Sequence, residues 1–193
     1  MKRVVAISGL LSSWALSACA IEPAPLEPSA QTSSALTAVA DFGDNPGKLE
    51  MHVYAPAHPL AAQPPLVVAL HGCTQSADDY QSAGWNELAE AQGFYVVYPG
   101  QTTANNPTRC FRWYDSAQTT RGQGEVASIA QMVSTMRARY GVGRVFVTGL
   151  SAGAAMTSSL LAAYPDVFEA GAIFSGIAAG CARTQLEAFS CMN

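Results

Sequence analysis

The chain has 193 residues, of which 49% are hydrophobic and only 12% are charged, and its formal net charge at pH 7 is -4. That length and apolar content suffice for one domain with a sizeable core. They exclude a small disulfide-held peptide and a chain kept disordered by charge repulsion. The 10 Lys+Arg residues form no basic block, so the sequence predicts no nucleic-acid partner. It gives no indication of oligomeric state.

The N-terminus has the pattern of an export signal. Lys2 and Arg3 precede a mainly apolar run over residues 4–16, which is too short to span a bilayer. The next residues, Leu16-Ser17-Ala18-Cys19, resemble the lipobox of bacterial lipoproteins. Residues 1–19 are therefore predicted to be a signal peptide, with lipidated Cys19 as a membrane tether. Ordinary cleavage among the small residues 18–20 and an uncleaved anchor are the alternatives. Either way we expect an exported protein, secreted or lipid-anchored to the cell envelope.

Export bears on the remaining four cysteines. An even number of cysteines in an oxidising compartment predicts two disulfides, for which three pairings exist. Proximity in the sequence favours Cys181 with Cys191, and elimination then leaves Cys73 with Cys110. Buried free thiols are the alternative. The cysteines and histidines lack zinc-ligand spacing, so no metal site is predicted.

The chain divides at about residue 36. Residues 20–35 are rich in Pro, Ser and Ala, which predicts a flexible linker, and residues 36–193 are predicted to form the folded domain. Apolar and polar residues alternate over residues 49–54, the period of a half-buried strand. Turn-forming residues 43–47 precede it, so residues 36–42 are a candidate hairpin partner.

The rest of the chain predicts an α/β fold. Four short apolar runs have the composition of strands buried on both faces, and residues 126–140 repeat apolar side chains every three or four positions, as on one helix face. Strands alternating with helices indicate a mainly parallel sheet with helices on both faces. The four runs are 66–70, 94–98, 144–148 and 170–174.

The chemistry begins at Gly149-Leu150-Ser151-Ala152-Gly153. This Gly-x-Ser-x-Gly sequence follows a predicted strand and precedes a segment that can be helical, which is the setting of a nucleophile elbow. Side chains at the glycine positions would collide with the sharp turn, while the serine hydroxyl stands clear. We therefore predict Ser151 as a nucleophile. A glycine-rich helix entry without chemistry is the alternative.

A second segment fits the same chemistry. His71-Gly72-Cys73 ends the predicted strand 66–70, at a position where an oxyanion loop would lie. Ester hydrolysis passes through an oxyanion that requires two backbone N–H donors. The N–H groups of Cys73 and Ala152 are the predicted donors, and a disulfide from Cys73 to Cys110 would stiffen the loop. Alternatively, Gly72 is an ordinary turn glycine without a role in an oxyanion loop.

Five blocks in order resemble the extracellular poly(3-hydroxybutyrate) depolymerase-like esterases, which include feruloyl and acetylxylan esterase relatives. The resemblance covers residues 65–193 and implies an α/β-hydrolase fold, Ser151 as nucleophile, carboxylic ester substrates and no cofactor. The ester would belong to a polyhydroxyalkanoate-type polyester or to feruloyl or acetyl groups on polysaccharide. The sequence departs from the family pattern at Arg112, which bears on specificity, and at Ala154. The blocks are Leu70-His71-Gly72-Cys73-Thr74-Gln75, Cys110-Phe111-Arg112-Trp113, Arg121-Gly122-Gln123-Gly124-Glu125, the serine elbow and Tyr164-Pro165-Asp166-Val167-Phe168.

The sequence lacks two groups that the mechanism needs. Serine attack requires an imidazole base and a carboxylate that orients it, which in this fold follow the serine in the order acid, then histidine. No histidine follows Ser151 in the chain. The histidines that precede Ser151 do not fit the role of the base, and the acidic residues that follow it do not fit the role of the orienting carboxylate. The domain is therefore expected to be incomplete at its C-terminal end. These unsuitable residues are His52, His58, His71, Asp166, Glu169 and Glu187.

Other functions remain open from the sequence. A non-catalytic surface lipoprotein, or an inactive fragment, that binds polyester or polysaccharide is one alternative. Another is a hydrolase with the same elbow but different chemistry, such as a peptidase or thioesterase.

The long segment 101–122 lacks a strong periodic element, and long loops in compact domains are often functional. Trp113 and Tyr114 within it are predicted to bind substrate, with packing of the loop as the alternative. Arg121 and Glu125, four residues apart at a predicted helix start, are expected to pair with each other.

These expectations make a first prediction. The polypeptide of residues 1–193 alone should hydrolyse esters at little or no rate, because it lacks a base for Ser151. The measurement is p-nitrophenyl ester hydrolysis by the refolded chain. Rates that vanish on Ser151→Ala would contradict it.

Overall fold

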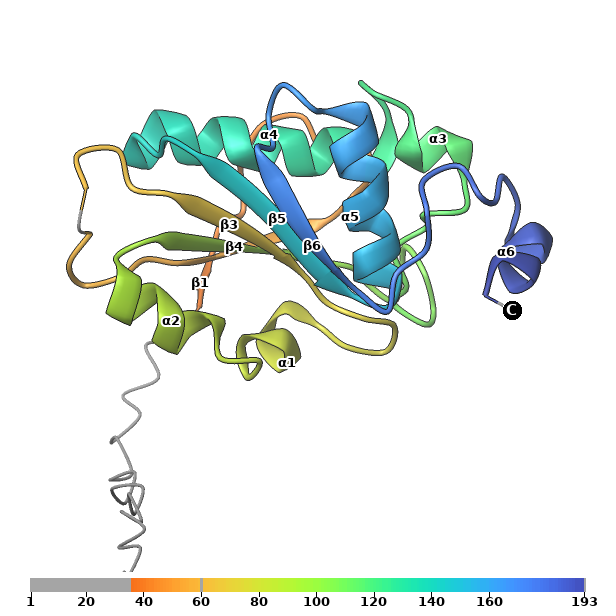
Figure 1. Cartoon of the computed structure of the whole chain (residues 1–193), viewed down its shortest axis with the longest axis horizontal. Coiled ribbons are helices and arrows are strands. Elements are labelled where there is room, and N and C mark those ends of the chain that lie inside the picture. Colours follow the sequence, from red (N-terminus) through yellow and green to blue (C-terminus); the bar gives the residue numbers. More distant parts are fainter. Residues whose placement is uncertain (1–35, 60, 193) are drawn as a thin grey trace, which may run out of the picture. The chain divides into compact units, whose positions relative to one another are not determined.

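The computed structural model describes residues 36–59 and 61–192, and these contain six strands in one sheet (Figure 1). The predicted signal at 1–19 with Cys19, and the linker at 20–35, lie outside the described residues and stay predictions. The sheet order is β1-β2-β4-β3-β5-β6. In chain order the elements are β1 (Thr37–Ala38), β2 (Glu50–Tyr54), β3 (Leu66–Leu70), α1 (Ala77–Gln81), α2 (Trp85–Gln92), β4 (Tyr95–Gly100), α3 (Ser116–Thr119), α4 (Gly124–Tyr140), β5 (Val145–Leu150), α5 (Ala152–Ala163), β6 (Ala170–Phe174) and α6 (Gln185–Cys191).

The sheet is mixed, with its four central and C-terminal strands parallel. β3, β4, β5 and β6 run in one direction, and β2 pairs antiparallel with β4. The predicted hairpin is confirmed, because β1 pairs antiparallel with β2 and aligns Thr37 with Val53. β1 is shorter than the expected 36–42. The Asn45 side chain holds the intervening turn by accepting from the N–H of Leu49 and donating to its carbonyl oxygen.

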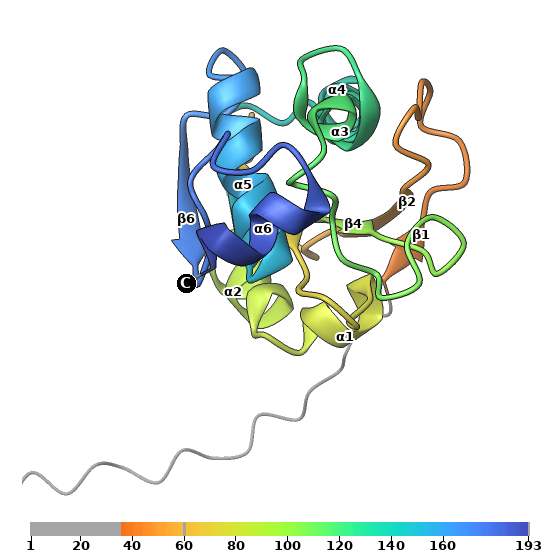
Figure 2. The same ribbon diagram turned by 90° about the vertical axis from the view of Figure 1, so that its right-hand side faces the viewer.

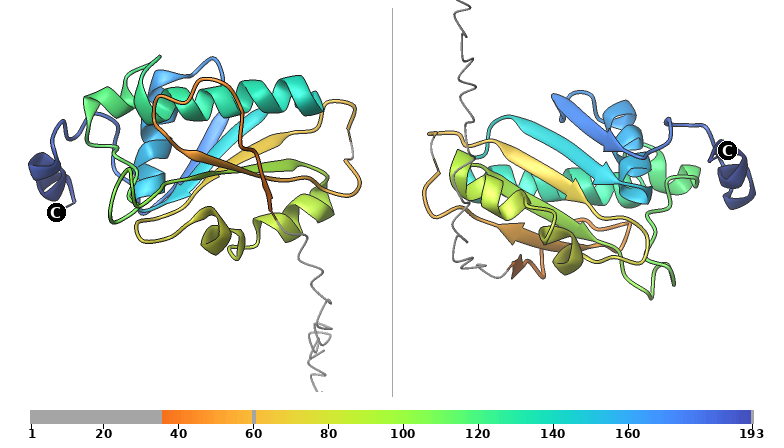
Figure 3. Two further views of the ribbon diagram at one scale, coloured as in Figure 1. Left: turned by 180° about the vertical axis from the view of Figure 1, so that it is seen from behind. Right: turned by 60° about the horizontal axis from the view of Figure 1, so that its bottom comes forward.

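Helices cover both faces of the sheet, as predicted (Figures 2 and 3). Successive residues of β3 point to opposite faces, as strand geometry requires. Leu66, Val68 and Leu70 belong to the larger core, which α4 and α5 close. Val67 and Ala69 face the smaller core, which α1 and α2 close. Both sides of the strand are therefore apolar, which explains why its sequence reads as a continuous apolar run.

The prediction that 170–174 is buried on both faces is wrong. All five residues of β6 are exposed, including Ile173 at 46% and Phe174 at 53%. β6 is an edge strand, and β5 is its one partner among the described residues. Composition predicted the strand correctly, but the burial of an edge strand depends on its neighbours.

The pairing predicted for Arg121 and Glu125 is also wrong. The Arg121 guanidinium donates to both carboxylate oxygens of Asp166, just beyond α5, and lies 4.5 Å from the centre of the Tyr164 ring. These hydrogen bonds lower the pKa of Asp166 to about 2.

The segment 101–122, for which no strong periodic element was predicted, contains the short helix α3, which begins where the Asp115 carboxylate accepts from the N–H of Ala117. Within residues 36–59 and 61–192, no helix is long and apolar enough to cross a bilayer.

Candidate active site

Ser151 occupies a sharp turn between β5 and α5. Its φ of 55° and ψ of −117° lie in a region that non-glycine residues rarely adopt. The Ser151 N–H donates to the carbonyl oxygen of Phe174 at 2.9 Å, and its own carbonyl oxygen accepts from Ala155 at 3.0 Å. Bonds to the end of β6 and to the first turn of α5 hold this costly backbone conformation in place.

The two glycines of the motif permit close backbone contacts. A Cβ atom on Gly149 would collide with the backbone of Gly153, and one on Gly153 would collide with the carbonyl oxygens of Leu70 and His71. Gly153 thus brings the first turn of α5 against the end of β3. This contact places the segment that follows β3 beside Ser151.

That neighbouring segment contains Cys73, one of the two predicted oxyanion donors, and the other donor, Ala152, directly follows Ser151. A Cβ atom built on Gly72 would lie 3.6 Å from the Cβ of Ser151. Ala152 is the first residue of α5, where a backbone N–H has no partner within the helix. Cys73, Ser151 and Ala152 line one pocket of about 310 Å³. The structure therefore brings together the three residues that the sequence assigned to nucleophile and oxyanion hole.

Both predicted disulfides are present. Cys73 is bonded to Cys110, and Cys181 to Cys191. A backbone hydrogen bond of 2.7 Å from Thr74 to Thr108 runs beside the first. The segment after β3 is therefore fastened to the loop that contains Trp113.

His71 supports the same segment and is fully buried. Its Nε2 atom accepts from the N–H of Gln101 at 3.0 Å, so its Nδ1 atom carries the proton and donates to the carbonyl oxygen of Gly72 at 2.7 Å. Burial lowers the pKa of His71. Both ring nitrogens are occupied in holding the loop, which agrees with the expectation that this histidine is not a base.

Glu125, at the start of α4, is a buried carboxylate that binds two loops. It accepts from the N–H of Arg112 at 2.8 Å, from the Arg112 Nε atom at 3.3 Å and from the Gln101 side chain at 2.7 Å. Burial raises the pKa of Glu125, and these three bonds oppose that rise. Arg112 thus fastens the loop to α4 and lies outside the lining of the Ser151 pocket.

The pocket has no histidine, aspartate or glutamate among the described residues that line it. His52 lies on β2 with its ring 3.6 Å from Glu50, while Asp166 binds Arg121 and Glu169 binds Arg144. The structure therefore assigns no described residue to the acid or the base that the mechanism requires. Among residues 36–59 and 61–192, no group of three or more His, Cys, Asp or Glu side chains is placed to hold a metal ion.

Sequence reasoning missed part of this pocket. Ser175, with a φ of 55°, and Gly176 follow β6 and line it together with Met192. Gly176 is glycine because a Cβ atom would press on the Cβ of Ala154. The signal was available, since parallel strands end at a common edge and residues after 170–174 should meet those after 144–148.

Trp113 packs in the core and also lines the pocket, and its predicted contact with substrate stays a prediction. It is only 8% exposed and packs in the larger core, and its remaining surface lines the Ser151 pocket. Tyr114 stands edge-on to it, with ring centres 5.6 Å apart. Tyr114 does not line the Ser151 pocket but lines a second pocket that Trp113 shares.

The fold and this turn define an α/β-hydrolase, and comparisons with solved structures agree. The acetyl xylan esterase from Aspergillus awamori matches 79% of this chain and 56% of its own, with a TM-score of 0.73 and 38% identity. Poly(aspartic acid) hydrolase-1 from Sphingomonas sp. KT-1 is 22% identical with a TM-score of 0.60, which supports the fold alone.

The chain belongs to the Esterase PHB depolymerase family, whose profile matches residues 49–193. Poly(3-hydroxyalkanoate) depolymerase C of Paucimonas lemoignei is 48% identical over 173 residues, 89% of this chain and 42% of the relative. Feruloyl esterase B of Talaromyces funiculosus is 41% identical over 153 residues, 77% of this chain and 42% of the relative. The chain thus spans less than half the length of these two relatives.

Glu125 provides a stability prediction. Glu125→Ala should lower the free energy of unfolding by about 3–5 kcal/mol, because it leaves buried donors without an acceptor. Glu169→Ala removes a comparable but exposed pair with Arg144 and should cost at most about 1 kcal/mol. Denaturant titration of both variants measures the difference. Equal decreases in the free energy of unfolding would show that the buried hydrogen bonds of Glu125 stabilise the fold no more than the exposed pair does.

His71 provides a pH prediction. Its folded-state pKa is lowered, so the unfolded chain binds more protons as the pH falls from about 6.5 toward that folded-state value. The free energy of unfolding should therefore decrease over that interval. His71→Asn should remove this component of the pH dependence, whatever it does to stability at pH 8. An identical pH profile in the variant would contradict the assignment.

Proposed function

We propose that this chain carries the nucleophile and oxyanion hole of an exported serine esterase that acts on carboxylic esters. Ser151 Oγ attacks the carbonyl carbon, and the N–H groups of Ala152 and Cys73 stabilise the oxyanion that forms. The alcohol then leaves, and water releases the acyl group from Ser151. The attack also requires an imidazole base and a carboxylate to orient it, which the described residues do not bring to this pocket.

The observation that carries the proposal is the shared pocket of Ser151, Ala152 and Cys73. The serine is held at positive φ, the first amide of α5 has no partner within its helix, and a disulfide braces the facing loop. A merely structural turn has no need of this combination. Polyhydroxyalkanoates and feruloyl or acetyl esters of polysaccharides are the proposed substrates, in line with the names of the relatives.

Export and the domain boundaries are part of the same proposal. Residues 1–19 would be the signal, 20–35 the linker and 36–193 part of the catalytic domain, with lipidated Cys19 as a membrane tether. The intact mass of the mature protein from its own cells tests this. A diacylglyceryl mass on an N-terminal Cys19 supports the tether, whereas an unmodified N-terminus near residue 20 supports secretion.

The catalytic test uses the natural gene product. Ser151→Ala should lower kcat for p-nitrophenyl acetate by about a thousandfold or more, because it removes the nucleophile. Ser134→Ala, on the exposed side of α4, is the matched control and should retain full activity. Ser175 lines the same pocket at a similar φ and is the rival nucleophile. Activity that survives Ser151→Ala and is lost in Ser175→Ala would assign the reaction to the end of β6 instead.

A further inference from the structure

The peptide group between Gly72 and Cys73 contains one of the two proposed oxyanion donors, the N–H of Cys73. No peptide bond among the described residues is cis, so the Gly72 carbonyl and the Cys73 N–H share a plane and point in opposite directions. A contact that fixes the carbonyl oxygen therefore also fixes the direction of the N–H. This matters for the reaction, because an oxyanion donor is effective only when it is aimed before the charge develops.

His71 holds this peptide group by its carbonyl. Glycine has no Cβ atom, so rotation of the peptide plane meets little steric resistance at Gly72. The hydrogen bond of 2.7 Å from the His71 Nδ1 atom to the Gly72 carbonyl oxygen opposes that rotation. The imidazole is held in turn by the N–H of Gln101, just after β4, which donates to its Nε2 atom at 3.0 Å.

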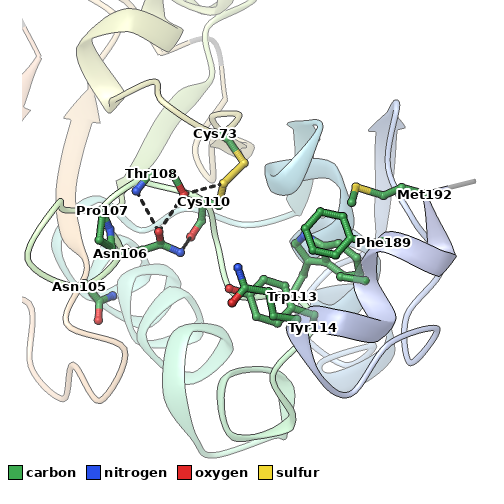
Figure 4. Close-up of a pocket in the computed structure, with 12 residues that line it drawn as sticks. Cys73, Asn105, Asn106, Pro107, Thr108, Cys110, Trp113, Tyr114, Phe189 and Met192 are labelled. Carbon is green, nitrogen blue, oxygen red and sulfur yellow. Dashed lines mark hydrogen bonds between the residues drawn. A yellow bond between two sulfur atoms is a disulfide. The ribbon is translucent and has the colours of Figure 1, made fainter.

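Glu125 restrains the same peptide group through two connections. One carboxylate oxygen accepts from the Gln101 side chain at 2.7 Å, and the other accepts from the N–H of Arg112 at 2.8 Å. Arg112 lies two residues after Cys110, which is bonded to Cys73. Figure 4 shows this disulfide at the edge of the second pocket, which α6 also lines. The first connection reaches the carbonyl of the peptide group, and the second reaches the side chain of Cys73.

Glu125 can do this without contact with an ester. Its side chain is fully buried and does not line the Ser151 pocket. Hydrogen bonds to a charged acceptor are stronger than neutral ones, and a low-dielectric interior strengthens them further. Each carboxylate oxygen has its own donor here, and the amide of a glutamine has only one oxygen. In this geometry Glu125→Gln would leave either Gln101 or Arg112 without an acceptor.

We infer that Glu125 is a positioning residue, which sets the direction of the Cys73 N–H and thereby the rate of acyl transfer to Ser151. The inference rests on the proposed function, because it takes Cys73 as an oxyanion donor. A misaligned donor weakens binding of the transition state more than binding of the ester, whose carbonyl oxygen carries less charge. Loss of Glu125 should therefore lower kcat and leave KM nearly unchanged.

The test uses the natural gene product and p-nitrophenyl acetate, with kcat expressed per folded molecule from a denaturant titration of each variant. Glu125→Gln should lower kcat about tenfold to a hundredfold and change KM less than about twofold, since loss of a whole donor costs about a hundredfold to a thousandfold. Met136→Ala, buried in the apolar core on the same helix, is the control that loses stability and keeps kcat. Gln101→Met removes one of the two connections and should lower kcat by a smaller factor.

A second measurement reads the peptide group directly. In protein labelled with ¹⁵N-cysteine, the amide signal of Cys73 should move in Glu125→Gln and stay in place in Met136→Ala. An unmoved signal, an unchanged kcat in folded Glu125→Gln, or an equal loss of kcat in Met136→Ala would overturn the inference. If Glu125→Gln does not fold, unchanged kcat in Gln101→Met would do so.

The outcomes also separate this inference from the proposed nucleophile. Activity lost in Ser151→Ala but unchanged in Glu125→Gln would leave the nucleophile in place and overturn the positioning role. Activity that survives Ser151→Ala, together with a Cys73 signal that moves only in Glu125→Gln, would overturn the nucleophile and support the link from Glu125 to the Cys73 N–H.

Discussion

The contact between Gly153 and the carbonyl oxygens of Leu70 and His71 is the constraint on which the site depends. Because no side chain separates the two backbones, the first turn of α5 lies against the end of β3. The residues that follow β3 must then pass beside Ser151. One missing Cβ atom therefore positions both the turn that exposes the serine and the loop that carries the facing amide, and any larger residue would push these two parts of the site away from each other.

Hydrogen bonds from buried polar side chains hold the loops beside Ser151 in place. Glu125 is linked through Gln101 to His71, which bonds to the carbonyl of Gly72. The Glu125 carboxylate also accepts from the N–H of Arg112, which lies two residues after Cys110 in the chain. The disulfide of Cys110 reaches Cys73. The segment after β3 is thus held at two adjacent residues, Gly72 and Cys73, from one carboxylate on α4. In a low-dielectric interior such a network is rigid only while every member is satisfied.

Sequence patterns predicted those parts of the structure that depend on local chemistry. Apolar runs and helical periods identified most of the sheet and the helices on the side of α4 and α5, and Gly-x-Ser-x-Gly identified the turn at Ser151. Partner choice was harder, because each partner comes from a segment distant in the chain: Arg121 bound Asp166, and Glu125 bound Arg112. The exposure of β6 and the share of α6 in the second pocket depend on the packing of distant segments, which no local pattern encodes. The base for Ser151 has no local signal in the described residues.

The two disulfides have a consequence for how this protein is made. The strands, α4 and α5 contain no cysteine, so no disulfide cross-links the scaffold elements themselves. The walls of the second pocket, which Trp113 and Tyr114 line, differ, because one bond fastens Cys73 to Cys110 and the other closes the segment around α6. A helix of seven residues has little stability of its own in water. Material produced in a reducing cytosol would therefore keep much of its secondary structure by circular dichroism while the walls of this pocket stayed loose. Solubility and spectra would then be poor guides to whether a preparation is fit for assay.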